Sequence, residues 1–481
     1  MSAPPGRSAG QPIERATPLA RFALRMTELT ERYMPDAFIF AILATIVVGI
    51  LAVIVDPGVR AKPTMLATAW GNGFWTLLTF SMQVALTIIG GSALATTPPA
   101  LRLLRWIARQ PKSPRGAVAT VALVAMTAGW FNWAFSLILA AILAKEMART
   151  QPKTDYRALG ACSILALGTV WAQGLSSSAS LFVATNGSMP PALVKIIGGL
   201  IPLSDTIFLW QSVLSVLIEV VVVTAIAWFM TPPPEKSVTA EQLGIDTGIG
   251  LTATPPRTQP GEWFEYSPVL TILVAVLALA YIVERFAAPG VGISALDLNM
   301  VNFIFLIAAM LLHWRPIRFM QAIREATPGT WAVMLQFPFY AGIFGLITGT
   351  KISAAIAGLF VSVANHYTYP VLIGIYSMVL GLAVPSGGSK WIIEAPYVIQ
   401  AAQQLHVHLG WVVSIYNLGE ASANLLQPFW MLPALGVLGL RARDIMGYTY
   451  MFAAILIPLV LIMAFVFNLM LNPGHEVVPI R

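Results

Sequence analysis

Apolar segments of roughly membrane-spanning length recur along the whole chain. They are 37–55, 70–95, 116–144, 158–189, 206–230, 267–283, 298–313, 330–349, 352–364, 369–403, 411–440 and 445–470. A helix of about 20 apolar residues crosses the hydrocarbon core of a bilayer, so this pattern predicts an all-α polytopic membrane protein. A transmembrane β-barrel would instead show alternating segments of about 10 residues, which the pattern lacks.

Composition supports this fold class and excludes several others. Of the 481 residues, 57% are hydrophobic and 10% are charged, against about 25% charged in a typical soluble protein. A soluble enzyme, a disordered protein and a nucleic-acid-binding domain are therefore excluded. Lys and Arg cluster between apolar runs, so the net charge of +7 points to membrane orientation rather than to nucleic acid. The single cysteine, Cys162, lies in an apolar run, and neither a metal site nor a cofactor is expected.

The positive charges predict which loops face the cytoplasm. They form three clusters: Arg7, Arg15, Arg21, Arg25 and Arg32; Arg102, Arg105, Arg109, Lys112 and Arg115; Lys145, Arg149, Lys153 and Arg157. By the positive-inside rule all three clusters are cytoplasmic, so both ends of 116–144 lie on one side. This stretch is too short for two full spans of about 20 residues each. We therefore predict a re-entrant hairpin that turns near Gly129–Trp133, with one long tilted helix as the alternative.

The second half of the chain repeats the plan of the first. Phe38-Ile39-Phe40 resembles Phe303-Ile304-Phe305, Pro114 and Pro370 each open a hairpin segment, and Asp205 and Asp444 each begin an apolar run. Each unit makes four crossings, and the run 267–283 adds one more, so the second unit enters the membrane upside down. Two inverted-topology repeats with re-entrant hairpins and interrupted helices are typical of secondary transporters.

This plan divides the chain into six segments. They are a cytoplasmic N-terminal tail with an amphipathic segment (1–35), a first transmembrane repeat (36–230), a flexible Pro-rich linker (231–266), an extra transmembrane helix and loop (267–297), a second repeat (298–470) and a C-terminal tail (471–481). The N-terminus is expected in the cytoplasm and the C-terminus in the periplasm.

Polar interruptions inside four apolar runs mark the predicted binding region. They are Gly129–Trp133, Gln173–Gly187, Val384–Trp391 and Asn417–Pro428. Helix breaks at mid-membrane leave N–H groups free to meet an anion, although small residues also serve helix packing. The third interruption has the composition of an anion-binding turn. The residues expected to bind substrate are Asn132, Ser176, Ser177, Ser178, Thr185, Asn186, Ser386, Gly387, Gly388, Ser389, Lys390, Asn424 and Gln427.

Four ionisable side chains lie inside apolar runs and are functional candidates on that ground. They are Glu219, Lys390, Glu394 and Glu420. Lys390 and Glu394 lie four residues apart and are expected to pair along one helix face. Either this pair only neutralises itself, or Lys390 attracts an anionic substrate while Glu394 or Glu420 carries a coupling proton. Sodium held by oxygen ligands is an equal alternative.

Several longer motifs carry a family resemblance. They are Met34-Pro35-Asp36 with Phe38-Ile39-Phe40-Ala41, Gln336-Phe337-Pro338-Phe339-Tyr340-Ala341-Gly342-Ile343, Ala383-Val384-Pro385-Ser386-Gly387-Gly388 with Trp391, Gln427-Pro428-Phe429-Trp430-Met431-Leu432-Pro433-Ala434-Leu435 and Arg443-Asp444-Ile445-Met446-Gly447-Tyr448. From about residue 20 to 470 the chain resembles the short-chain fatty acid transporter family (AtoE type) of the ion transporter superfamily.

The resemblance implies uptake of small monocarboxylates, such as acetoacetate or butyrate, across the bacterial inner membrane. The expected partners are then a small carboxylate, a proton or sodium ion and the lipid bilayer, with no nucleic acid. The sequence does not decide between a monomer and a homodimer. A transporter of another small anion such as a dicarboxylate, an anion channel and a membrane-embedded enzyme are the alternatives, and the enzyme is disfavoured because no nucleophile or metal motif occurs in the sequence.

Overall fold

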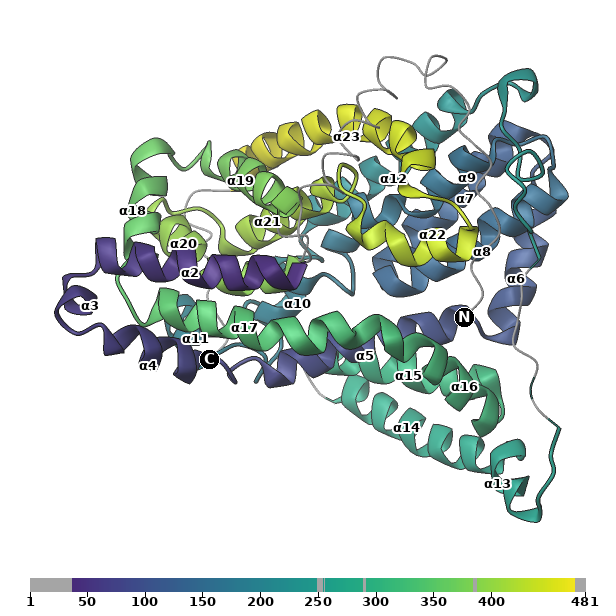
Figure 1. Ribbon diagram of the computed structural model, residues 1–481, viewed down its shortest axis with the longest axis horizontal. Helices are drawn as coiled ribbons and strands as arrows, with labels where there is room; N and C mark the ends of the chain where they lie inside the picture. Colours follow the sequence, from purple (N-terminus) through teal and green to yellow (C-terminus); the bar gives the residue numbers. More distant parts are fainter. Residues whose placement is uncertain (1–36, 249–253, 255, 289–290, 384–386, 472–481) are drawn as a thin grey trace, which may run out of the picture.

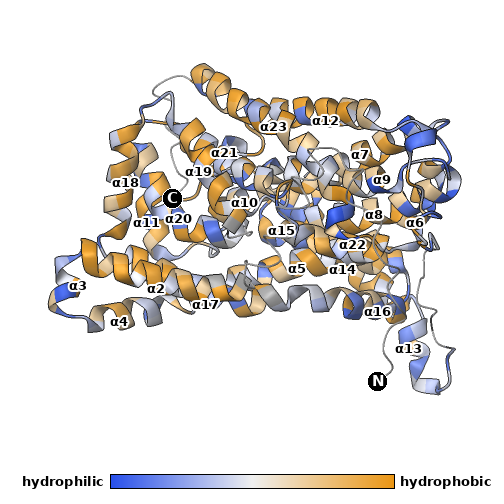
Figure 2. Ribbon diagram, turned by 45° about the horizontal axis from the view of Figure 1, so that its top comes forward, coloured by the Kyte–Doolittle hydropathy of each residue, from blue (hydrophilic) through white to orange (hydrophobic). Residues whose placement is uncertain are grey.

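The computed structural model describes residues 37–248, 254, 256–288, 291–383 and 387–471. Within these ranges the regular secondary-structure elements are helices, which confirms the all-α fold class. Most of the longer helices lie roughly along the long axis of the molecule (Figure 1). Apolar residues cover the outer helices, and hydrophilic residues gather at the two ends, near α3 and near α6 and α13 (Figure 2). This is the distribution that a bilayer imposes on a protein that spans it.

The first half contains α2 (Ala37–Val55), α3 (Pro57–Ala61), α4 (Thr64–Gly73), α5 (Leu78–Ala95), α6 (Pro98–Ala108), α7 (Pro114–Phe131), α8 (Trp133–Thr150), α9 (Tyr156–Ser163), η2 (Leu165–Gly168), η3 (Val170–Gln173), α10 (Ser178–Ala184), α11 (Pro191–Ile197) and α12 (Trp210–Met230). The second half contains α13 (Trp263–Tyr266), α14 (Val269–Ala287), α15 (Leu298–His313), α16 (Pro316–Ala326), α17 (Trp331–Thr348), α18 (Ile352–Val363), α19 (Tyr369–Ala383), α20 (Gly387–Gln404), α21 (Leu409–Ala423), α22 (Leu432–Leu438) and α23 (Ala442–Met470). Among the described residues, five helical stretches are long and apolar enough to cross a membrane: Leu78–Ala95, Trp210–Met230, Pro260–Ala287, Pro316–Thr348 and Ala442–Met470.

The first predicted hairpin is present, and it turns at Asn132. The side chain of Asn132 caps α8 by accepting a hydrogen bond from the N–H of Phe135 at 2.9 Å. At the open end, Gln151 Nε2 donates to the carbonyl of Pro111 at 2.8 Å. The two ends therefore lie together, which rules out a single tilted helix. Each arm has 18 residues, or about 27 Å. Together the two arms are longer than the uncharged stretch 116–144, because the charged turns on either side of that stretch are helical too.

A second hairpin is formed by α19 and α20. Tyr369 OH donates to the carbonyl of Val398 at 2.8 Å, and near the open end His366 Nδ1 lies 3.3 Å from the carbonyl oxygen of Leu405. The turn itself, at residues 384–386, lies outside the described residues. The segment that Pro370 opens thus folds back on itself as the first hairpin does.

The two halves pack on one another reciprocally. Helices α2 and α4 of the first half pack on α17 of the second, while α15 and α16 of the second pack on α5 of the first. In the same way α8 contacts α22, and α20 contacts α10. Two copies of one unit related by an approximate two-fold axis would produce this pattern, which supports the predicted repeat. The opposite orientation of the two copies remains a prediction.

The beginning of the predicted linker packs against α9. Asp155 Oδ2 accepts a hydrogen bond from the N–H of Val238 at 2.9 Å, and the N–H of Tyr156 donates to the carbonyl of Val238 at 2.9 Å. Ala240 is buried in the adjacent apolar cluster. These contacts attach the start of 231–266 to the first half of the chain. The boundaries of the six segments otherwise stay predictions.

Candidate substrate-binding site

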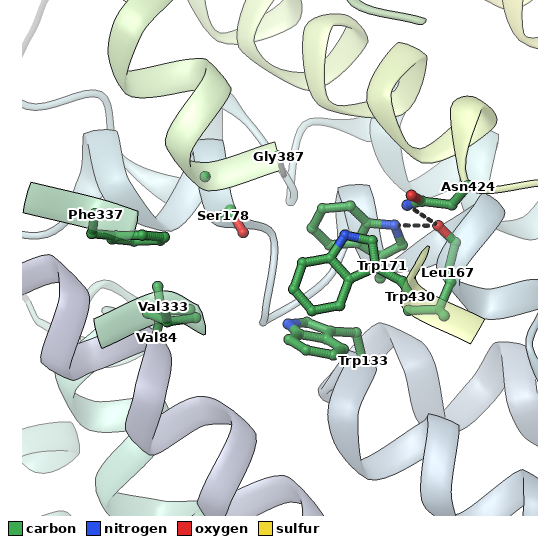
Figure 3. Close-up of a pocket in the computed structure, with 11 residues that line it drawn as sticks. Val84, Trp133, Leu167, Trp171, Ser178, Val333, Phe337, Gly387, Asn424 and Trp430 are labelled. Carbon is green, nitrogen blue, oxygen red and sulfur yellow. Dashed lines mark hydrogen bonds between the residues drawn. The ribbon is translucent and has the colours of Figure 1, made fainter. Parts of the chain in front are cut away.

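All four predicted interruptions contribute to one pocket (Figure 3). Its lining residues are Val84, Trp133, Leu167, Trp171, Ser178, Val333, Phe337, Gly387, Gly388, Asn424 and Trp430. Trp133 comes from the first hairpin, and Ser178 from the break between η3 and α10. Gly387 comes from the second hairpin, and Asn424 from the break between α21 and α22. Four segments that are distant in sequence therefore meet at one place.

Aromatic and aliphatic side chains form most of the pocket wall. Figure 3 shows the indole rings of Trp133, Trp171 and Trp430 on one side and Phe337 on the other. All three indoles make specific contacts. Trp171 Nε1 donates to the carbonyl of Leu167 at 2.6 Å, and the rings of Trp133 and Trp430 lie 5.2 Å apart, edge to face. Such a wall suits a short hydrocarbon chain.

The polar part of the pocket is the start of α20 beside Ser178. The first N–H groups of a helix have no intrahelical partner and carry a partial positive charge. Gly387 and Gly388 are the first two residues of α20. A Cβ built on Gly388 would lie 3.4 Å from Ser178 Cβ, so the hydroxyl-bearing residue is immediately adjacent. A carboxylate can be held here by backbone N–H groups and a hydroxyl.

Glycine is required at position 387 by close packing. A Cβ at Gly387 would lie 2.8 Å from the Trp171 ring, 3.3 Å from Asn417 Oδ1 and 3.3 Å from Glu420 Cγ. Any larger residue would have to displace the pocket wall. The start of α20 is thus in direct contact with both the aromatic wall and α21.

Ser176 and Ser177 connect the interrupted segments to one another. Ser176 Oγ accepts a hydrogen bond from the N–H of Trp133 at 2.9 Å. Ser177 caps α10, and its Oγ accepts a hydrogen bond from Asn417 Nδ2 at 2.8 Å. Both side chains are buried. Among these serines it is Ser178 that lines the pocket.

Three predicted site residues lie away from the pocket. Asn132 is occupied in capping α8, and its Nδ2 reaches the carbonyl of Thr87 at 3.4 Å. Thr185 Oγ1 donates to the carbonyl of Leu181 and accepts from the N–H of Leu298. Asn186 is exposed. Helix ends thus use the polar atoms of Asn132 and Thr185, and a substrate contact of these three residues stays a prediction.

The remaining predicted residues divide between the pocket and its surroundings. Asn424 lines the pocket, with Nδ2 donating to the carbonyl of Leu167 at 2.9 Å. Gln427 is buried behind it and donates from Nε2 to Asn424 Oδ1 at 2.7 Å. Ser386 and the side chain of Ser389 lie outside the described part of the chain.

Lys390 pairs with Glu420 and not, as predicted, with Glu394. Its Nζ lies 2.5 Å from Glu420 Oε2, donates to Ser377 Oγ at 2.9 Å and also donates to the Ser377 carbonyl. Glu394 instead accepts a hydrogen bond from Tyr416 OH at 2.6 Å. The sequence spacing showed only neighbours on the same helix, whereas packing brings α21 against α20. Lys390 is 1% exposed and faces its buried partners rather than the pocket.

Sequence reasoning missed the aromatic part of the site. Trp171, Trp430 and Phe337 line the pocket, although their positions in apolar runs made them look like ordinary lipid-facing or packing residues. Tryptophan close to a helix break, as Trp133 and Trp171 are, was the available signal.

Comparison with known proteins decides the family. The chain matches the family model described as "Short chain fatty acid transporter" over residues 18–468. The protein belongs to the short-chain fatty acid transporter family. It is therefore a multi-pass membrane transporter of small molecules and not an enzyme, as the sequence predicted.

Relatives match over nearly their whole length. A candidate short-chain fatty acid transporter of Escherichia coli (strain K12) is 38% identical over 431 residues, which cover 89% of this chain and 96% of that protein. A second candidate short-chain fatty acid transporter, from Haemophilus influenzae, is 36% identical over 435 residues, with 89% and 96% covered.

Two solved transporters share the fold at low sequence identity. The YdaH transporter of Alcanivorax borkumensis, which has an unusual topology, superposes with a TM-score of 0.58 at 15% identity, covering 91% of this chain and 99% of that one. MtrF of Neisseria gonorrhoeae, from a class of antimetabolite efflux pumps, has a TM-score of 0.56 at 15% identity, with 95% and 98% covered. At this identity the likeness concerns the fold alone.

Proposed function

We propose that this chain is a secondary active transporter that carries small monocarboxylates, such as acetoacetate or butyrate, across the inner membrane together with a proton or a sodium ion. The observation that carries the proposal is the asymmetry of the pocket. At one part of its lining the N-terminus of α20 adjoins Ser178, and the rest of the wall is mainly aromatic and aliphatic. A short monocarboxylate has the same two-part chemistry.

Within this proposal the carboxylate binds at the start of α20. A carboxylate cannot be buried without replacement of its water, because unpaired burial of a charge costs many kcal/mol. The N–H groups of Gly387 and Gly388, with the Ser178 hydroxyl, replace that water. Asn424 limits the other side of the pocket.

The charge balance supports transport together with a cation. None of the described residues that line the pocket is charged. The nearby Lys390 is already neutralised by Glu420. An anion bound here therefore brings an uncompensated charge, which a co-transported proton or sodium ion would cancel. The same absence of lining charge disfavours a dicarboxylate, whose second carboxylate would meet the aromatic wall.

The predicted coupling residues Glu394 and Glu420 lie directly behind this site. Glu420 Cγ is 3.3 Å from the Cβ position of Gly387, and Glu394 is reached through Tyr416. A cation held by these groups would be close to the bound carboxylate. In the proposed cycle the two hairpins and their interrupted helices move against the rest of the protein, which opens the pocket to each side in turn.

Purified protein in proteoliposomes tests this function. Uptake of a labelled panel of mono- and dicarboxylates is measured while proton and sodium gradients are set separately. We expect saturable uptake and counterflow of short monocarboxylates, with accumulation driven by one of the two gradients. Flux that neither saturates nor shows counterflow would indicate a channel, and preference for dicarboxylates would refute the proposed substrate class.

A further inference from the structure

Helix α12 turns its polar residues inward and its apolar residues outward. Gln211, Ser215 and Glu219 follow one another at four-residue spacing, and all are at most 1% exposed. Leu217 and Val221 on the opposite face are 57% and 67% exposed. In a membrane helix, buried polar residues of this kind face a functional interior far more often than lipid.

Glu219 is unlike the other buried acids in having no partner among the described residues. Within the described part of the chain its oxygens have neither a hydrogen-bond partner nor an ion pair, and the side chain is 0% exposed. Glu420 instead pairs with Lys390, and Glu394 accepts from Tyr416. A buried, unpaired carboxylate is very costly, whereas the neutral acid is tolerated. Glu219 can therefore gain or lose a proton without the breaking of a salt bridge.

No charged group of α7, α23 or η3 faces Glu219 in the described structure. Helix α12 packs mainly on these three elements, and it also touches α21 through Ser212 and Ser414. The titratable side chains are Arg115 on α7, Arg443, Asp444, Tyr448 and Tyr450 on α23, and Tyr416 and Glu420 on α21, where Glu420 is paired with Lys390. Gly116, next to Arg115, lies against Trp228 near the far end of α12, more than two turns beyond Glu219. The charged residues of α23 lie in its first turn, whereas Phe467 near its other end contacts Trp210.

A buried polar contact joins α12 to the helix that carries Glu420. Ser212 Oγ lies at hydrogen-bond distance, 3.4 Å, from Ser414 Oγ. On α21, Ser414, Asn417 and Glu420 follow at three-residue spacing, and all three are 0% exposed. Trp210 and Trp411, at the starts of the two helices, both pack on Phe467. The two polar faces therefore approach each other close to their first turns.

Several polar atoms near this contact also lack a partner in the described part of the protein. They are Gln173 Oε1, Gln173 Nε2, Gln211 Oε1 and Asn417 Oδ1. Gln173 belongs to η3, which packs on both α12 and α21. Buried polar atoms without a protein partner commonly bind ordered water, and bound water can relay a proton. These polar atoms lie on η3, on α21 and on α12 itself.

We propose that Glu219 is a proton-binding site of the transport cycle and that the polar faces of α12 and α21 connect it to the substrate site. The carboxylate takes up one proton from water on one side of the membrane, is buried as the neutral acid, and returns that proton to water on the other side. This inference rests on the proposed symport and selects the proton as its coupling ion.

The test compares Glu219→Gln, Glu219→Asp and the exposed control Glu241→Gln in proteoliposomes. Glutamine has the shape of the neutral acid but cannot exchange a proton. Under a pH gradient we expect Glu219→Gln to accumulate at least tenfold less substrate than wild type. The variant should keep substrate counterflow, because counterflow needs no net proton movement. Glu219→Asp should recover part of the accumulation, and Glu241→Gln should behave as wild type.

Three results would overturn the inference. One is wild-type accumulation by Glu219→Gln, and another is equal loss of accumulation and counterflow, which would show a structural role only. The third is wild-type uptake that responds to sodium alone, in which case the transport function survives and the proton site does not. Infrared spectroscopy gives a readout without substrate: the difference spectrum between wild type and Glu219→Gln should contain the carbonyl band of one buried carboxylic acid, and the absence of that band from the difference would refute the assignment.

Discussion

Lys390 and Glu420 form a buried ion pair whose charged atoms lie 2.5 Å apart. The pair joins the second hairpin to α21, and Ser377 on the other arm of the hairpin completes the ammonium's hydrogen bonds. Both side chains are at most 1% exposed. Buried pairs of this kind contribute little net stability, but removal of one partner leaves an uncompensated charge.

Lys390→Gln should therefore destabilise the protein strongly. The expected loss is about 3–5 kcal/mol, because Glu420 would remain buried without its cation. Thermal unfolding of the purified protein in detergent measures the effect. The double variant Lys390→Met with Glu420→Gln should recover most of the lost stability. If the double variant were as unstable as the sum of the two single variants, the two residues would not act as a pair.

Gly387→Ala should block the pocket without preventing membrane insertion. The added methyl would meet the Trp171 ring; overpacking of this kind costs about 1–3 kcal/mol of stability, and displacement of the ring changes the shape of the pocket and so weakens substrate binding. Uptake kinetics measure the change. Gly358→Ala on α18 is the matched control, since nothing lies within 4 Å of a Cβ there. Unchanged uptake in Gly387→Ala would remove the start of α20 from the site.

Trp430→Ala should shift preference toward longer monocarboxylates. Removal of one indole lengthens the apolar part of the pocket, and each further buried methylene contributes about 0.8 kcal/mol, or roughly fourfold in affinity. Competition by acids of increasing chain length against labelled butyrate measures the shift. Trp263→Ala, at an exposed position on α13, should leave the order of preference unchanged. An unaltered order in Trp430→Ala would contradict the proposed position of the hydrocarbon chain.

Cysteines placed at Lys112 and Gln151 should react with an impermeant thiol reagent from the same side of the membrane. The reason is the hydrogen bond between Gln151 and the carbonyl of Pro111, which holds the two ends of the first hairpin together. Native Cys162 is buried and gives a low background. From the positive charges around both positions we expect labelling from the cytoplasmic side. Labelling from opposite sides would refute the hairpin.

Ser176→Ala should loosen the tip of the first hairpin. It leaves the N–H of Trp133 without its partner at a part-buried position, which costs about 1–3 kcal/mol. We expect a lower unfolding temperature and a higher KM for uptake, because Trp133 forms part of the pocket wall. Ser362→Ala, at an exposed position on α18, should change neither value. Wild-type stability and kinetics in Ser176→Ala would show that this bond does not position the wall.

Local sequence was sufficient for the features that depend on a short stretch of chain. The length and polarity of each run predicted an all-helical membrane protein. The polar residues that interrupt four of these runs predicted where helices would break, and the charge clusters around 116–144 predicted that its ends lie together. Each of these features depends on whether a segment of chain is stable in hydrocarbon or in water, which its own composition determines.

Only the tertiary structure decided which of these segments meet and which atoms remain available. The partner of Lys390 is thirty positions away in the sequence, and hydrophobic periodicity carries no information on that pairing. Asn132 and Thr185 looked like ligands, but their polar atoms are used by neighbouring helix ends. Trp171 and Trp430 looked like ordinary apolar residues, and packing made them the wall of the pocket. Contacts between distant segments depend on side-chain shape across the whole assembly, and a single sequence records composition along the chain but not proximity in space.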